Sequence, residues 1–183
     1  MGAITVQLRK MMRSQMHSWR FFEMFLRVMI TLSTGTAVVL SSISICDGNW
    51  LLAPGQPLFA VWDTCRASRN PPCSEEMVQL SRCMVVVRSA VSLGVVMAIF
   101  GLELLMVSQL CDDGKPMKRW KVGSVMLLVA FFMSSVGTLT YVILLKDFIV
   151  YSTFTLTFWC QFLATFLFFL NGVSGLYLNH LVM

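Results

Sequence analysis

Residues 84–110 read MVVVRSAVSLGVVMAIFGLELLMVSQL, and this stretch decides the fold class. It is almost continuously apolar and carries only two charged side chains, Arg88 and Glu103. A helix needs about 20 such residues to cross a hydrocarbon core that is about 30 Å thick. The stretch therefore predicts a transmembrane helix.

Three further apolar stretches are long enough to span a bilayer, at residues 28–45, 122–145 and 148–176. The composition agrees, because 57% of the 183 residues are hydrophobic and only 13% are charged, which is far from the soluble norm. No internal repeat or long linker separates a second domain. We therefore expect one all-α membrane domain, residues 1–183, built as a bundle of four transmembrane helices.

The distribution of lysine and arginine predicts the orientation of the spans. Five basic residues lie in the arm 1–27 and four lie in the loop 111–121, whereas the segment 46–83 balances three arginines against four acidic residues. Loops rich in Lys and Arg stay in the cytoplasm. We therefore expect both termini, with the tail 177–183, to be cytoplasmic. The segment 46–83 and a short turn at 146–147 are then extracellular.

Arg88 and Glu103 need an explanation because charge inside a membrane is costly and is by default a functional hypothesis. Arg88 lies near the outer end of its span and can extend toward the headgroups. Glu103 lies fifteen residues further on, about 22 Å along the helix, so the two cannot pair. We expect Glu103 either to meet water near the cytoplasmic boundary or to form an intramembrane polar clamp with hydroxyls such as those of Ser134 or Ser135. A proton relay is the alternative.

Small residues recur every four positions in the same span, at Ala90, Gly94 and Ala98. This spacing places them on one helix face, where a neighbouring backbone can approach closely. We interpret the three as the internal helix-packing seam of the bundle. A surface that receives another protein is the alternative interpretation.

The chain has six cysteines, and their positions relative to the bilayer predict their states. Cys65 and Cys73 lie in the outer segment and bracket a short loop, so we expect a disulfide between them. Cys46 and Cys83 also lie near the outer boundary, which leaves a second bridge or a swapped pairing open. Cys111 follows the second span on the cytoplasmic side, where palmitoylation is open as well.

Catalytic and metal-binding patterns are missing from the sequence. The two histidines, His17 and His180, lie far from any cluster of cysteines or carboxylates with metal-ligand spacing. There is no phosphate-binding glycine loop and no nucleophile elbow. We therefore expect no enzyme activity, no cofactor, no metal and no small-molecule substrate. The basic residues sit beside apolar runs, so we expect contact with the lipid bilayer and no nucleic acid.

The outer segment carries a motif whose order is informative. It contains Trp50, the tripeptide AVW that ends at Trp62, then Cys65 and Cys73, and Arg88 follows at the start of the next span. This order resembles the signature of the claudin and peripheral myelin protein superfamily, in which Gly-Leu-Trp precedes two cysteines and an arginine. Here Ala-Val replaces Gly-Leu.

Three longer stretches narrow the resemblance: AVVLSSISICDGNWLLA at 37–53, AIFGLELLMVSQLC at 98–111 and FTLTFWCQF at 154–162. They are similar to the voltage-dependent calcium channel gamma-like subunits. The resemblance implies a claudin-like bundle that carries a small extracellular antiparallel β-sheet from the first outer loop. In that fold Cys65 and Cys73 are joined, and Trp50 and Trp62 lie near the junction of sheet and membrane.

The function that the resemblance implies is that of an auxiliary subunit in the plasma membrane. Such a subunit docks beside the pore-forming alpha-1 subunit of a voltage-gated calcium channel and shifts its gating, inactivation above all. The alternative is a claudin-like cell adhesion or paracellular barrier protein. We disfavour it because a turn of two residues at 146–147 leaves almost nothing to meet an opposing cell.

The outer segment lacks the Asn-x-Ser/Thr sequon that is common in gamma-type subunits, so we expect no N-glycan there.

Overall fold

The computed structural model describes residues 2–47, 50–52, 75–110, 116–144 and 153–182. Four long helices dominate this part of the chain: α1 (Gly2–Asp47), α2 (Glu75–Leu110), α3 (Pro116–Leu144) and α5 (Leu156–Val182). Each contains a segment that is long and apolar enough to cross a membrane, namely Phe21–Asp47, Cys83–Leu110, Met117–Leu144 and Leu156–Leu181. The prediction of four transmembrane helices is confirmed.

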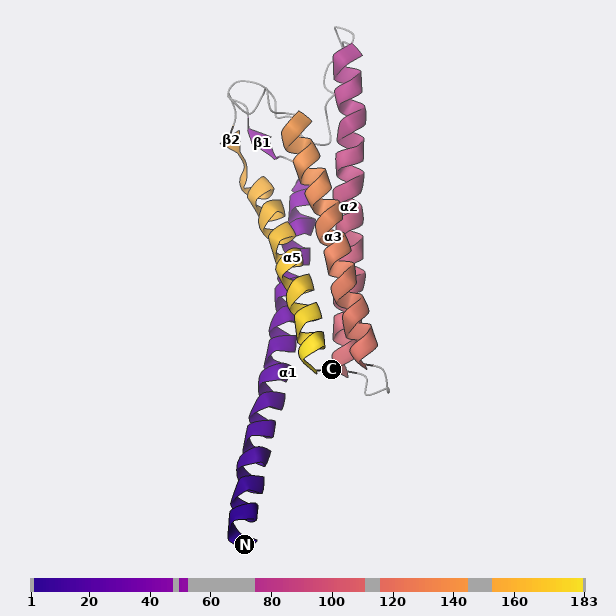
Figure 1. Ribbon diagram of the computed structural model, residues 1–183. Helices are drawn as coiled ribbons and strands as arrows, with labels where there is room; N and C mark the ends of the chain where they lie inside the picture. The colour runs from indigo at the N-terminus through magenta and orange to yellow at the C-terminus, as the bar shows by residue number, and fades with distance from the viewer. Residues whose placement is uncertain (1, 48–49, 53–74, 111–115, 145–152, 183) are drawn as a thin grey trace.

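The helices run up and down beside one another (Figure 1). α2 and α3 share the largest interface, the pairs α1–α5 and α3–α5 come next, and α1–α2 is the smallest of the four. The first turns of α1 extend past the other helices, at the same end of the bundle where α5 finishes (Figure 1). Both chain ends therefore lie on one side of the bundle.

Three helices begin earlier than the predicted spans. α1 starts at Gly2, so the predicted arm 1–27 is helical and continuous with the first span. α2 starts at Glu75, inside the predicted outer segment. α3 starts at Pro116, inside the predicted loop 111–121, and proline is favoured at a first helical position because the N–H that it lacks has no helical partner there.

The fourth span begins later than predicted. We expected a helix from residue 148 after a turn at 146–147, whereas α3 ends at Leu144 and α5 begins at Leu156. The Thr155 carbonyl accepts a hydrogen bond from the Trp159 N–H at 3.3 Å, which makes Thr155 the N-cap, a position where threonine is favoured. The prediction was wrong because hydropathy alone does not separate a short apolar run from the helix that follows it.

One short antiparallel strand pair connects the two halves of the chain. β1 (Leu51–Leu52) follows α1, β2 (Thr153–Phe154) precedes α5, and Leu51 is paired with Phe154. The Thr155 N–H extends the pair by donating to the Trp50 carbonyl at 3.1 Å. The sheet expected from the first outer loop alone lies mostly in residues 53–74, outside the described part of the chain.

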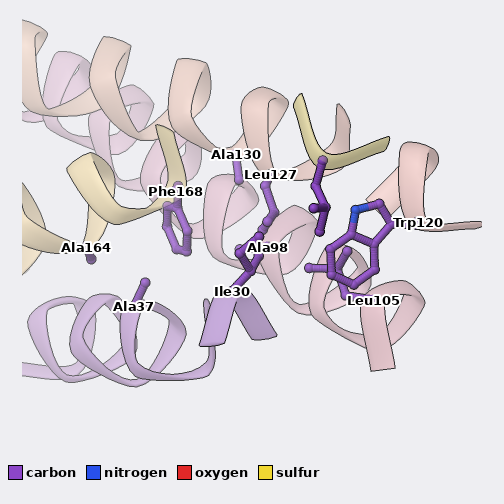
Figure 2. Packing of buried hydrophobic residues seen from close by; sticks show 10 residues of the cluster. Ile30, Ala37, Ala98, Leu105, Trp120, Leu127, Ala130, Ala164 and Phe168 are labelled. Atoms are coloured by element: carbon purple, nitrogen blue, oxygen red, sulfur yellow. The ribbon is translucent and has the colours of Figure 1, made fainter. Parts of the chain in front are cut away.

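Two clusters of buried apolar side chains form the core. The larger cluster draws on all four helices and is shown in Figure 2; it comprises Ile30, Ala37, Ala98, Leu105, Trp120, Leu127, Ala130, Ala164, Phe168 and Leu178. The second cluster lies beside the strand pair and comprises Trp50, Met84, Val87, Val91, Tyr141 and Phe158. We call the two ends of the bundle the Trp120 end and the Trp50 end.

Candidate functional site

Small residues hold α2 against α3. A Cβ atom added to Gly94 would lie 2.5 Å from the Ser134 Oγ and 3.2 Å from the Ala130 carbonyl oxygen. Ala98 is fully buried in the core, and Ala90 is half-buried. Lipid tails are as apolar as the helix surfaces, so the hydrophobic effect does not bring helices together inside a membrane. Close packing of backbones, which small residues allow, drives their association instead. The structure thus places Gly94 and Ala98 within the bundle.

Two further glycines bring the same pair of helices into backbone contact. A Cβ added to Gly101 would lie 3.1 Å from the Gly123 carbonyl oxygen, and one added to Gly123 would lie 3.0 Å from that of Gly101. Gly137 is enclosed by Val91, whose Cγ2 would be 2.5 Å from an added Cβ. Any larger side chain at these positions must displace a neighbouring helix.

Polar side chains connect α1 to α5. The Asn171 Nδ2 donates to the Ser33 Oγ at 3.1 Å, and the Ser41 Oγ donates to the Gln161 Oε1 at 2.8 Å. The Ser44 hydroxyl adds a third bond, 2.7 Å to the carbonyl of Thr157. The sequence did not lead us to expect these bonds. The signal that could have indicated them is the carboxamides of Gln161 and Asn171 within the apolar run 148–176, since such groups form hydrogen bonds with other helices.

Trp50 closes the bundle at the strand pair. Its side chain is 2% exposed, and its indole N–H donates to the Ser44 carbonyl at 3.1 Å. The ring packs edge-on against Tyr141 and Phe158, with centroid distances of 4.9 Å and 6.2 Å. Such aromatic pairs add stability beyond the area that they bury. Trp62, Cys65 and Cys73, the other predicted residues of this motif, lie outside the described residues.

Trp120 organises the opposite end. Its indole N–H donates to the Gly175 carbonyl on α5 at 3.0 Å, and the Arg27 guanidinium of α1 lies over its ring at 4.8 Å from the centroid. Arg27 also forms an ion pair with Glu23 at 2.7 Å. On α2, Gln109 donates to the Thr31 hydroxyl at 2.5 Å. All four helices are therefore connected at this level, and polar contacts here suit the edge of a membrane.

The two charged residues of the second span lie in different surroundings. Arg88 is half-buried near the Trp50 end. Glu103 is exposed, and within the described helices it forms no hydrogen bond or ion pair. The predicted clamp to Ser134 is not formed, because the Ser134 Oγ is buried against Gly94 without a hydrogen-bond partner. Glu103 lies about 160° around the helix axis from the buried Leu105, so it points away from the bundle.

Three of the six cysteines lie within the described helices. Cys46, Cys83 and Cys160 are free thiols, with Cys46 exposed, so Cys46 and Cys83 are not bridged. Cys111 lies outside the described residues. Among the described helices and strands, no three His, Cys, Asp or Glu side chains come together as a metal site. What the arrangement offers chemically is a surface for binding inside a membrane.

That surface is mostly apolar, and the described helices enclose hollows between them. A groove of about 480 Å³ runs between α1 and α2, lined by Thr31, Leu32, Gly35, Thr36, Val39, Leu40, Leu102 and Met106. A smaller hollow of about 200 Å³ lies between α3 and α5, lined by Phe131, Ser135, Thr138, Leu139, Phe162, Thr165 and Phe166. Lipid chains or a partner helix can fill either one.

Comparison with known proteins gives one consistent result. The family model described as the voltage-dependent calcium channel gamma-like subunit protein family matches residues 8–183. A human protein named voltage-dependent calcium channel gamma-like subunit is 46% identical to this chain over 184 aligned positions, which cover 98% of this chain and 96% of the human protein.

Proposed function

The chain belongs to the voltage-dependent calcium channel gamma-like subunit family, and from this premise we propose that it binds the pore-forming alpha-1 subunit of a voltage-gated calcium channel and modulates its gating. The family is one of channel auxiliary subunits and not of enzymes. The observation that carries the proposal is the full-length similarity to a relative named as such a subunit. The four apolar helices agree with a partner met inside the membrane.

Modulation requires a difference in affinity. A subunit that binds all channel states equally well changes nothing, whereas one that prefers the inactivated state shifts the channel toward it. A preference of about 1.4 kcal/mol changes that equilibrium about tenfold. We propose that inactivation is the gating step that responds.

We propose that the protein resides in the plasma membrane, with the Trp120 end of the bundle and both termini in the cytoplasm. The two chain ends share one side of the bundle, as an even number of spans requires (Figure 1). Lys118, Arg119 and Lys121 flank Trp120 at the start of α3, and Arg27 lies beside it. A basic cluster at one end of the spans supports a cytoplasmic position for that end.

We also propose that the outer segment forms the small extracellular β-sheet and is closed by a disulfide between Cys65 and Cys73. The pairing of β1 with β2 supports extended structure on this side of the bundle. A non-reducing digest should release a peptide pair linked through these two residues. Recovery of both as free thiols would contradict the claudin-like outer fold.

Voltage-clamp recording tests the main proposal. Cells that express an alpha-1 subunit with this protein should show a shifted midpoint of voltage-dependent inactivation or a changed current amplitude, relative to cells that express the alpha-1 subunit alone. The matched control is an unrelated four-span membrane protein at equal surface expression. Currents that match this control would overturn the proposal.

A claudin-like adhesion protein is the second candidate. The predicted turn at 146–147 lies outside the described residues, which resume at Thr153. Part of the connection between α3 and α5 is paired with β1, since Thr153 lies opposite Leu52. Expression in cells that lack adhesion proteins distinguishes the two candidates, because only a barrier protein should cause aggregation and strand formation.

A further inference from the structure

We propose that the face formed by α1 and α2 docks against a transmembrane helix of the channel that carries an arginine or lysine beside Glu103. This inference rests on the proposed function and deepens it by naming the docking face and the chemistry of the partner. Two independent features meet on this face. One is the carboxylate of Glu103, and the other is an open glycine, Gly35, in the neighbouring helix.

Glu103 lies inside the apolar segment Cys83–Leu110 of α2, which is long enough to cross a membrane. It is seven residues before the end of α2 at Leu110, which corresponds to about 10 Å, and six residues before Gln109, which meets Arg27 and Thr31 at the Trp120 end. Charged groups within a span normally face a bundle interior or pair with one another. Glu103 does neither within the described helices, so its carboxylate is open to a group on a partner molecule.

One mostly exposed stripe runs along the outward face of α2 and carries Glu103. Residues recur at alternating intervals of four and three positions along it: Val85, Ser89, Ser92, Val96, Ile99, Glu103, Met106 and Leu110. Ser92 is half-buried and the other seven are exposed. A repeat of 3.5 residues keeps one stripe against a partner helix over its whole length. Glu103 is the charged position within this stripe, where a polar residue fixes the register of two paired helices.

Gly35 shows where the partner helix can approach. Six other glycines in the described spans, at positions 94, 101, 123, 137, 172 and 175, have atoms of a neighbouring helix within 4 Å of an added Cβ. Gly35 has none, and it lines the groove between α1 and α2. A glycine facing open space in a span lets an external backbone come close.

The two features lie at the same depth. Thr31 meets Gln109, and α1 and α2 run antiparallel. Four residues along each helix from this contact, Gly35 is level with Leu105 and so within about 3 Å of the level of Glu103. Met106 belongs both to the groove and to the stripe on α2. A helix seated over Gly35 therefore passes beside Glu103.

Charge decides which helix fits. A second copy of this chain, packed through the same face with the same membrane orientation, would bring two Glu103 carboxylates together at one depth, and like charges in a low dielectric repel. An arginine or lysine instead supplies the opposite charge and hydrogen-bond donors. A basic residue on a channel helix is therefore the matching partner.

Co-purification of the full complex tests the inference. The alpha-1 subunit is tagged and isolated in mild detergent, and the co-purified amounts of the wild-type protein, Glu103→Leu and Gly35→Leu are compared. We expect each variant to co-purify at least about tenfold less than wild type. Glu103→Leu leaves the basic group of the channel helix unpaired, and Gly35→Leu fills the space through which that helix approaches. Val136→Phe, which adds bulk to an exposed position on α3, should co-purify like wild type.

Size-exclusion profiles check the fold of each variant, and crosslinking gives a second readout on the unchanged surface. A photoreactive residue at position 32, which lines the groove and is 63% exposed, should crosslink to the alpha-1 subunit, whereas one at position 136 should not. Crosslinks from position 32 to a second copy of this chain would overturn the inference. Undiminished co-purification of both variants would overturn it while leaving the proposed function intact. Failure of the wild type to co-purify would overturn both.

Discussion

Two of the interfaces in the bundle, α2–α3 and α1–α5, hold their helices together in different ways. Between α2 and α3, four glycines bring the backbones close together, and an added Cβ atom would lie 2.5 to 3.1 Å from its nearest neighbour; they are Gly94, Gly101, Gly123 and Gly137. Between α1 and α5, hydroxyls and carboxamides form hydrogen bonds of 2.7 to 3.1 Å. The first interface depends on shape, and the second depends on polar groups placed opposite one another.

This difference indicates what each interface contributes. A larger side chain at a packed interface strongly destabilises it, because there is no free space to hold the added atoms. Hydrogen bonds between membrane helices contribute only about 0.6 kcal/mol each on average, since the separated helices also find partners. We therefore expect the α2–α3 pair to supply most of the stability and the α1–α5 bonds to set the register.

The largest effect should come from filling the α2–α3 interface. Gly137→Leu would drive a side chain into Val91 and the Val87 carbonyl oxygen, which lies 3.2 Å from the position of a Cβ atom. We expect a loss of about 3 kcal/mol in the free energy of unfolding, measured by titrating micelles with a denaturing detergent. The matched control is Gly35→Leu, which meets open space and should leave stability equal to or above that of wild type. Equal losses for the two variants would remove the distinction between interior and outward glycines.

A smaller effect should follow from the loss of Trp120. Trp120→Phe keeps most of the buried ring but removes the N–H that donates to the Gly175 carbonyl at 3.0 Å. The carbonyl is then left without this donor, so we expect a loss of about 1 to 2 kcal/mol in the same titration. Trp159→Phe provides the control, because Trp159 is exposed on α5 and should tolerate the change. Indistinguishable results for the two would show that the hydrogen bond at the Trp120 end contributes nothing measurable.

The α1–α5 bonds should give the next smaller effect. A double-mutant cycle of Ser41→Ala and Gln161→Ala isolates their bond, and we expect a coupling energy of about 0.6 kcal/mol. The Nε2 of Gln161 is buried without a partner, which limits what the carboxamide adds. A coupling energy as large as the loss in Gly137→Leu would show that polar contacts and not glycine contacts hold the bundle together.

The smallest effect concerns the free thiols. Cys46→Ser and Cys83→Ser should leave stability and assembly within about 0.5 kcal/mol of wild type, because neither residue is bridged. Maleimide labelling of the folded protein should modify the exposed Cys46 faster than the half-buried Cys160. Protection of Cys46 until a reductant is added would instead indicate a disulfide.

Hydropathy and charge spacing predicted the four spans, because the length of an apolar run can be read from each segment without knowing its neighbours. They did not predict that α5 begins at Leu156, since that boundary depends on the Thr155 cap and on the pairing of Thr153 with Leu52. The small-residue repeat indicated that Gly94 and Ala98 face a neighbour but did not indicate which helix. Pairing across the bundle depends on which faces meet, and one helix sequence does not contain that information.

The candidate docking face at Glu103 and Gly35 shows the same contrast between features of a single segment and features that depend on packing. The sequence marked Glu103 as unusual because a carboxylate in a span is visible by itself. The predicted hydrogen bond to Ser134 is not formed, since Glu103 points outward. Gly35 attracted no attention in the sequence, because only the empty space beside it distinguishes it from the six glycines that face other helices.

A structure of the full complex with a calcium channel alpha-1 subunit, determined by electron cryomicroscopy, would locate the docking face itself. We expect density for this protein beside the channel, with α1 and α2 facing a channel helix, Gly35 beneath the backbone of that helix and a basic side chain next to Glu103. A complex in which α3 and α5 form the contact, or in which Glu103 faces only lipid, would contradict this expectation.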